Sequence, residues 1–564
     1  MALLCKRILL FILFFSFTLY FFCNYSYKSY SGAFPFSFKP NPNSRRWNSN
    51  GLAKPNPDSL SESTSIHFNN PRSSLLNPVN HNLDSLVSKP GSASESSVFK
   101  ERKELDDWVA AQYDISLSLI NDNISPTGAM KGSVCASRSK LNPDYYYHWI
   151  RDSALTMNML IQNLNNSDPG LIERLLQIED FIDFSYHISN WKSLPSGLGE
   201  PKFNMDGTPF LKEWGRPQND GPALRSICLI NYANYLISQV RIVDHLYCDS
   251  GCIINNDLDY IVDNWRESSF EIWEEVKGFN YYTVMVQLKA LEMGQLLASI
   301  LGDFESAKRY HSVLLEMKDS LDLFWDKQNQ IIMSTIHWAG GMPYKLNNLD
   351  SQSFLALLHT WDDSTDFYTD NTFTRTLSTV FDLFKYFNRE YKINSEGLPA
   401  IAMGRYPGDK YDGYDSKSYG NPWPLITMGV AELYYKLSYE FSTQDHLYLD
   451  RIMVKFLNLK FFDSHQINLN LKSSEEPIIV NRDTIEFWDI VKSLFYNGEE
   501  FLKRVKHHTA SDGSISEQWN RVTGFNQGAP NLTWSYTAFC TMKVARDRIK
   551  QILFTQPSFI LKIP

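Results

Sequence analysis

The sequence predicts a mainly α-helical fold in which long loops separate the helices. Two observations support this prediction: apolar residues recur at helical spacing over long segments, and the alternation typical of half-buried strands is scarce. In segment 284–301 the apolar positions follow a helical repeat, and the segment stops at Gly302, a residue type that often ends helices. Comparable helical segments are predicted at 155–164, 224–246, 304–323, 372–388 and 425–441.

The first hundred residues differ from the rest of the chain. A charged start followed by a mostly apolar run predicts a secretory signal peptide at 1–23, or an uncleaved signal-anchor, because small residues suited to cleavage are few. Residues 24–100 are rich in Ser, Asn and Pro and predict a disordered linker. We therefore expect one folded domain at 101–564. It would enter the secretory pathway and be secreted, vacuolar, or membrane-anchored with the domain facing the lumen or the cell exterior.

The composition narrows the classes of partner. The chain has 564 residues, a formal net charge of −9 and no stripe of Lys and Arg, so nucleic acid is not an expected partner. Contact with a membrane is expected only through residues 1–23, if they are retained. Aromatic residues make up 14% of the chain, and many lie in polar loops, where flat rings suit sugars.

Cysteine spacing and known motifs give no sign of a metal or cofactor. Cys248 and Cys252 bracket a short turn and are expected to form a small disulfide rather than half of a zinc site, because no second ligand pair is visible. Nucleotide-binding and metalloprotease motifs are absent from the sequence, and the acidic residues at 409–415 lack EF-hand spacing. We predict no metal and no cofactor. Glycosylation sequons occur at Asn24, Asn123, Asn165 and Asn531.

Five loop segments are much richer in charged, aromatic, Gly and Pro residues than their helical flanks. They lie at 143–154, 213–226, 270–283, 402–423 and 514–538. In these segments the chain resembles fungal glucoamylases, glycoside hydrolase family fifteen, and most closely the yeast members. The resemblance extends over roughly 105–546 with the motifs in the family's order. It implies an all-α fold, an (α/α)₆ barrel, that acts on α-glucans, and we expect a monomer.

Two glutamates in these loops fit glycoside hydrolysis. That reaction needs one carboxylic acid to protonate the leaving oxygen and one carboxylate to activate water or attack. By resemblance, Glu274 matches the general acid and Glu517 the general base. Glu275 is adjacent to Glu274, so the two side chains are expected to point in different directions and take different roles. Trp273 and nearby apolar groups are expected to shield Glu274 from water.

The resemblance also implies a set of substrate-binding residues. They are Tyr145, Trp149, Arg151, Asp152, Trp214, Glu275, Arg405, Asp409, Tyr411, Trp423 and Trp534. Without the family context, each neighbouring Arg and Asp would more often form a structural ion pair, and a lone Trp would more often belong to the core. Asp220 either contacts sugar or caps the following helix.

The expected reaction is inverting removal of terminal α-1,4-linked glucose, and more slowly α-1,6-linked glucose, from non-reducing ends of starch, glycogen or maltodextrins. Gly408 replaces the family's usual Glu, Glu271 replaces an Asp, and the loop before Asn421 is longer than in many fungal members. Gly408 and the longer loop at 408–420 keep open a related α-glycosidase with another linkage preference. A glucan-binding protein without activity would not need a second carboxylate, and a structural cell-surface protein would not explain the loops.

Overall fold

The computed structural model describes residues 95–555, except 249–250, 344, 346–347, 363–370, 460, 462–470 and 472–475. The expected signal segment, and the linker up to residue 94, lie outside the described residues. The first described helix, α2, begins at Glu95.

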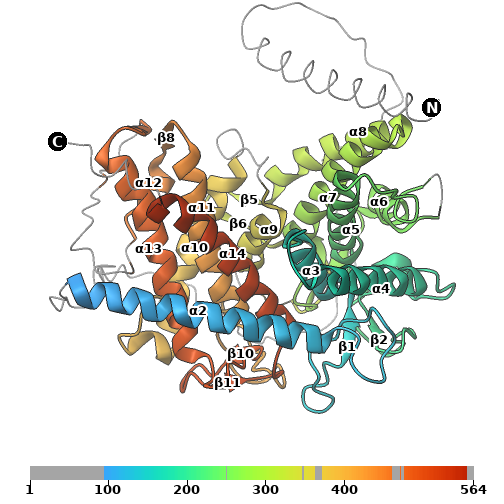
Figure 1. The fold of residues 1–564 in the computed structure, drawn as a ribbon, viewed down its shortest axis with the longest axis horizontal. Coiled ribbons are helices and arrows are strands. Elements are labelled where there is room, and N and C mark those ends of the chain that lie inside the picture. The colour runs from blue at the N-terminus through green and yellow to red at the C-terminus, as the bar shows by residue number, and fades with distance from the viewer. Residues whose placement is uncertain are drawn as a thin grey trace, which may run out of the picture. The chain divides into compact units, whose positions relative to one another are not determined.

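Twelve helices of the described residues form an inner and an outer layer. Figure 1 labels each of these helices. The inner layer consists of α3 (Ile150–Gln162), α5 (Asp220–Ser238), α7 (Tyr281–Leu301), α9 (Gln352–Thr360), α11 (Pro424–Thr443) and α14 (Thr533–Thr555). The outer layer consists of α2 (Glu95–Asn123), α4 (Leu171–Ser189), α6 (Ile253–Asn264), α8 (Phe304–Ser320), α10 (Asn371–Glu390) and α13 (Ile485–His508). Each inner helix packs against the next, and α14 returns to α3, so the ring closes. The fold is an (α/α)₆ barrel, as the resemblance implied.

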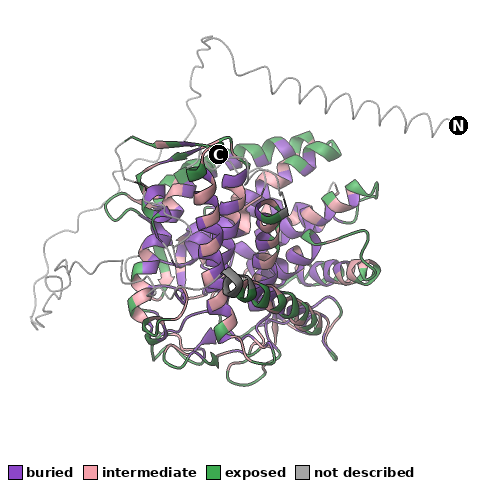
Figure 2. Cartoon of the chain, turned by 60° about the vertical axis from the view of Figure 1, so that its left-hand side comes forward, coloured by how far each residue is buried: buried purple, intermediate pink, exposed green. Residues whose placement is uncertain are grey.

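Burial explains why the two layers differ. Inner helices such as α11 are buried on nearly all sides, whereas outer helices bury one stripe. In α10 that stripe includes Phe373, Leu377, Val380 and Phe384, which recur at three- and four-residue spacing. Figure 2 shows buried residues concentrated in the interior helices and exposed residues on the outer ones.

Short antiparallel strand pairs lie in the loops and connections between the helices. They are β1 (Tyr147–Trp149) with β2 (Lys202–Asn204), β3 (Ser269–Phe270) with β4 (Val276–Asn280) and β7 (Thr335–Gly341), β5 (Trp325–Asp326) with β6 (Ile331–Ile332), β8 (His446–Leu449) with β9 (Ile478–Asn481), and β10 (Gln518–Trp519) with β11 (Asn526–Gln527). A further short helix, α12 (Arg451–Leu457), follows β8. The pairs β1–β2, β3–β4 and β10–β11 matter most here, because they fix loops that carry candidate site residues.

Helix boundaries follow the sequence signals at some ends and depart from them at others. Helix α7 ends at Leu301, and Gly302 then adopts a left-handed φ of 86°. Helix α5 ends at Ser238, eight residues before the predicted end at 246. There Val240 takes a φ of 58° and the amide of Arg241 donates back to the Leu236 carbonyl, so the chain turns out of the helix.

The expected disulfide is present, whereas one of the glycosylation sequons is buried. Cys248 and Cys252 form the expected disulfide. Asn165 is exposed, whereas Asn123 is buried and its side-chain amide donates to the Thr533 hydroxyl at 2.8 Å. Asn123 is therefore unavailable as a glycan acceptor in the folded domain.

One described helix, α7 (Tyr281–Leu301), is long and apolar enough to cross a membrane. It is an inner helix of the barrel, with 56% of its most apolar window buried inside the fold. The apolar residues of α7 are explained by their burial in the core of the barrel.

Candidate active site

A cavity of about 1060 Å³ lies where the loops enter the inner helices. Trp149 and Trp423 each stand immediately before an inner helix, and Arg151 and Trp534 lie in first turns, so the cavity occupies the amino-terminal end of the barrel. Helix amino termini carry partial positive charge, which favours carboxylates there. Every predicted site residue except Asp409 lines this cavity.

Glu274 is surrounded by donors within the cavity. Its carboxylate accepts hydrogen bonds from the indole Nε1 of Trp149 at 2.7 Å and of Trp214 at 2.9 Å, and from Gln218 Nε2 at 2.9 Å. Arg151 Nη2 lies 3.5 Å from the same carboxylate. These N–H groups fix the orientation of the Glu274 carboxylate.

A buried anchor holds the turn that carries Glu274. The fully buried carboxylate of Glu271 accepts the backbone amides of Trp273 at 2.8 Å, Glu275 at 3.0 Å and Val276 at 3.2 Å. Glu274 itself adopts a φ of 65°, a left-handed conformation that costs energy for a residue with a Cβ. The hydrogen bonds of Glu271 restrain the backbone around this strained position.

The side chain of Trp273 turns away from Glu274. Its indole donates to Asp350 at 2.8 Å, and Asp350 is paired with Lys345 at 2.7 Å. Lys345 also lies 3.4 Å from Glu271, and burial nevertheless raises the pKa of the Glu271 carboxyl above its usual value. Trp273 thus belongs to the support of the turn as well as to the cavity wall.

Glu275 reaches partners different from those of Glu274, as the sequence predicted. It accepts hydrogen bonds from Arg405 Nη2 at 2.8 Å and from the Tyr406 hydroxyl at 2.5 Å. Arg405 is buried and also donates to both oxygens of Asp409, at 2.8 and 2.6 Å. Asp409 does not line the cavity, so its contribution is to orient Arg405 by a bidentate contact.

Glu517 is the second carboxylate of the predicted pair, and it lies fully buried in the segment before β10. Its carboxylate accepts a hydrogen bond from the Tyr145 hydroxyl at 2.7 Å and a longer one from the Tyr411 hydroxyl at 3.4 Å. Burial raises the pKa of Glu517 to about 7, against the opposing effect of the Tyr145 hydrogen bond and the charge of Arg405. The protein thus surrounds two carboxylates in one cavity with different donors.

Arg151 connects several acidic groups at the cavity wall. Its Nη1 donates to Gln218 at 3.0 Å and to Asp220 at 3.1 Å, and its Nε lies 3.4 Å from Asp152. Burial raises the pKa of Asp152 to about 6, although Arg151 acts in the opposite direction. Asp220 neither caps α5 with its side chain nor lines the cavity; it pairs with Arg151.

Three buried side-chain atoms at this cavity make no hydrogen bond. In the described residues Arg151 Nε, Asp152 Oδ2 and Trp423 Nε1 are buried and make no hydrogen bond, and all three side chains line the cavity. Arg151 Nε and Asp152 Oδ2 are nevertheless ion-paired with each other at 3.4 Å. Trp423 Nε1 has no such partner among the described residues, and a buried polar group without a hydrogen bond calls for an explanation such as a functional role.

Lys202 is a site residue that the sequence analysis missed. Strand β2 places it opposite Trp149, and its ammonium lies 3.2 Å from the ring centre of Trp214 and 4.4 Å from that of Trp149. Burial lowers the pKa of Lys202 to about 8, although the charge of Glu274 opposes this shift. The indoles of Trp149 and Trp214 both donate to Glu274, so Lys202 supports the Glu274 carboxylate through them.

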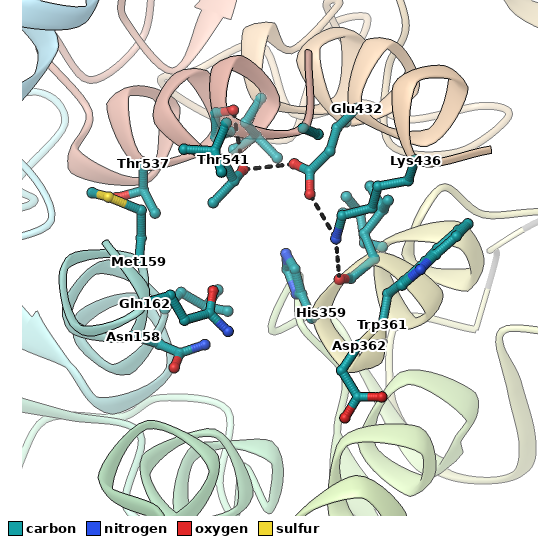
Figure 3. A pocket seen from close by; sticks show the side chains of 18 of the residues that line it. Asn158, Met159, Gln162, His359, Trp361, Asp362, Glu432, Lys436, Thr537 and Thr541 are labelled. Atoms are coloured by element: carbon teal, nitrogen blue, oxygen red, sulfur yellow. Dashed lines mark hydrogen bonds and ion pairs between the residues drawn. The ribbon is translucent and has the colours of Figure 1, made fainter. Parts of the chain in front are cut away.

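A second cavity, of about 440 Å³, lies among the inner helices (Figure 3). Trp534 lines both cavities. One carboxylate of the second cavity, Glu432, accepts a hydrogen bond from Thr541 at 2.6 Å and pairs with Lys436 at 2.9 Å. The predicted carboxylates Glu274 and Glu517 line the larger cavity and not this one, so the larger cavity is the better candidate for chemistry.

Comparisons with known proteins agree with this arrangement. The sequence model of "Glycosyl hydrolases family 15" matches residues 111–543. Glucoamylase 1 of Rhizopus oryzae is 33% identical over 462 residues, which are 81% of this chain and 74% of that protein. A sporulation-specific intracellular glucoamylase of Saccharomyces cerevisiae is 32% identical over 482 residues, covering 80% of this chain and 85% of the relative.

A solved structure is similar in fold and sequence. The glucoamylase of Saccharomycopsis fibuligera superimposes with a TM-score of 0.71 at 32% identity, covering 79% of this chain and 96% of that chain. The family match spans well over half of the chain and includes all five predicted loop segments, each of which contributes residues to the larger cavity. The chain therefore belongs to glycosyl hydrolases family 15.

Proposed function

We propose that this protein is a glucoamylase that removes glucose from the non-reducing ends of starch, glycogen or maltodextrins and releases it as β-D-glucose. The observation that carries the proposal is that Glu274 and Glu517, from loops far apart in the sequence, line one cavity with different hydrogen-bond partners. Similarity to curated glucoamylases over about four fifths of the chain supports the substrate class.

In the proposed mechanism Glu274 is the general acid. It transfers its proton to the glycosidic oxygen as the bond from that oxygen to the anomeric carbon breaks. Trp149, Trp214 and Gln218 hold the carboxylate in one orientation and donate to the carboxylate that forms after the transfer. The leaving sugar departs with a hydroxyl group.

Glu517 is the proposed general base. It accepts a proton from a water molecule, whose oxygen bonds to the anomeric carbon on the face opposite the leaving group, so the configuration inverts. The Tyr145 hydroxyl orients Glu517 for this step. Exchange of protons with solvent then restores Glu274 and Glu517 to their starting states.

The remaining cavity residues would hold the terminal glucose. Arg151, Asp152, Glu275 and Arg405 supply charged donors and acceptors for hydroxyl groups. Six aromatic residues offer rings against which sugar faces pack: Tyr145, Trp149, Trp214, Tyr411, Trp423 and Trp534. Asp409 acts through Arg405 rather than by direct contact.

The organisation of the chain is also part of the proposal. Residues 101–564 would form the catalytic domain, connected by the 24–100 linker to a signal or anchor segment at 1–23 that directs it into the secretory pathway. The enzyme would act there, or after secretion, as a monomer. No residue in the mechanism requires a metal or cofactor.

The proposal is tested by Glu274→Gln and Glu517→Gln. Each change keeps the shape of the side chain but removes its acid–base function, so kcat on maltoheptaose should fall by a factor of about 10² to 10⁴. Circular dichroism and maltoheptaose binding should remain close to wild type. Glu432→Gln, a buried carboxylate of the second cavity, is the matched control and should keep most of its turnover. Near-wild-type rates in either active-site variant would contradict the assignment.

A further inference from the structure

The mouth of the larger cavity is marked by two exposed aromatic rings. Most of the aromatic residues that line the cavity are buried or half-buried, but Trp214 is 42% exposed and Tyr414 is 48% exposed. Trp214 donates to Glu274 and therefore stands on the side of the leaving sugar. Tyr414 has no role in the proposed mechanism. Within the described residues its ring and hydroxyl make no ring contact and no hydrogen bond.

The loop that carries Tyr414 is held in place by Asp412. The Asp412 carboxylate accepts the backbone amides of Tyr414 at 3.0 Å and Asp415 at 3.1 Å, and the amide of Asp412 donates to the Asp415 carbonyl at 3.0 Å. The ring of Tyr414 is thus presented on a closed turn. A platform held in this way loses little conformational entropy when a ligand packs on it.

The same loop is docked beside the proposed general base. The Asp412 carbonyl accepts hydrogen bonds from Gln527 Nε2 at 2.6 Å and from Asn421 Nδ2 at 3.1 Å. Gly413 lies so close to Gly528 that a Cβ on Gly413 would be 2.7 Å from the Gly528 Cα, and a Cβ on Gly528 would be 2.3 Å from Glu517 Oε2. Tyr414 is therefore positioned by the backbone that surrounds Glu517.

We propose that Tyr414 is a specificity-determining residue that binds glucose units on the reducing side of the scissile bond, beyond the first unit held near Trp214. This inference rests on the proposed function. The terminal glucose would occupy the buried part of the cavity, so the rest of a longer glucan must leave through the mouth. There the exposed face of Tyr414 is available for the C–H edges of a sugar ring.

Tyr414→Ala, Tyr414→Phe and Tyr419→Ala test the inference. Tyr419 is the matched control, because it lies on the same loop and is 71% exposed but does not line the cavity. For Tyr414→Ala, kcat/KM on maltoheptaose should fall by about three- to tenfold, mainly through a higher KM, while kcat/KM on maltose stays near wild type. Tyr414→Phe should keep the preference for the long substrate, since the ring remains, and Tyr419→Ala should behave as wild type.

The possible outcomes separate this inference from the proposed function. Wild-type protein that releases no glucose from maltose or maltoheptaose would overturn both. An active wild type with an unchanged Tyr414→Ala, or with equal losses on maltose and maltoheptaose, would overturn the role of Tyr414 alone. A loss in Tyr419→Ala as large as in Tyr414→Ala would also overturn it, because the effect would then belong to the loop as a whole.

Discussion

Gly528 offers a sharp test of how closely the fold fixes Glu517. The residue has a φ of 74°, and a Cβ at this position would lie 2.3 Å from Glu517 Oε2 and 3.2 Å from the Cα of Gly413. In Gly528→Ala the carboxylate would have to move by about 1 Å to restore ordinary van der Waals contact. A displacement of that size at a reacting group costs roughly a hundredfold in rate.

The same substitution strains the backbone. A left-handed conformation costs about 1–2 kcal/mol for a residue with a Cβ, so Gly528→Ala should lower the free energy of unfolding by at least that amount. Gly397→Ala separates the two effects: Gly397 has a φ of 68°, but a Cβ there would meet no atom within 4 Å. The free energy of unfolding of Gly397→Ala should fall by a similar amount, while its kcat/KM should stay near wild type.

The assay is kcat/KM on maltoheptaose for both variants, with urea unfolding as the measure of stability. We expect about a hundredfold loss of kcat/KM in Gly528→Ala and little change in Gly397→Ala. Wild-type kcat/KM in a folded Gly528→Ala protein would refute the placement of Glu517, because the added methyl group cannot be accommodated without moving that carboxylate or its strand.

Two further predictions concern the pKa of Glu517 and the stability of the barrel. Burial raises the pKa of Glu517 to about 7, and the hydrogen bond from Tyr145 opposes this rise. Because the general base must be ionised, Tyr145→Phe should move the acidic limb of the kcat/KM–pH profile to higher pH. An acidic limb at the same or a lower pH would contradict this prediction. Arg225 donates to both oxygens of Asp257, at 2.8 and 2.6 Å, and both side chains are buried. Arg225→Met leaves the buried Asp257 charge without its partner, so the free energy of unfolding measured in urea should fall by about 3–5 kcal/mol. A loss below about 1 kcal/mol would show that Asp257 finds another partner.

The parts of the fold that could be predicted from the sequence are those with local signals. Helical periodicity and Gly302 locate most of α7 and its end, because both signals lie within a few residues of the feature. The end of α5 could not be predicted, since Val240 carries no sign of the left-handed conformation it adopts. The closed ring of helices was implied by the family resemblance and not by periodicity.

The candidate site shows the same division. The loop motifs identified many of the residues that line the larger cavity, including Glu274 and Glu517. They did not reveal Lys202, because its place beside Trp149 and Trp214 depends on the pairing of β1 with β2 across about fifty residues of chain. For Asp409 the motifs left open both sugar contact and an ion pair with Arg405, and the structure shows the ion pair, with Asp409 outside the cavity lining.

The most direct test of the central claim is the configuration of the first glucose released from maltoheptaose, followed by proton NMR of the anomeric signals before mutarotation. Inversion by Glu274 and Glu517 predicts that β-glucose appears first, with no larger initial product. Initial α-glucose would contradict the inverting mechanism, and larger first products would contradict exo action.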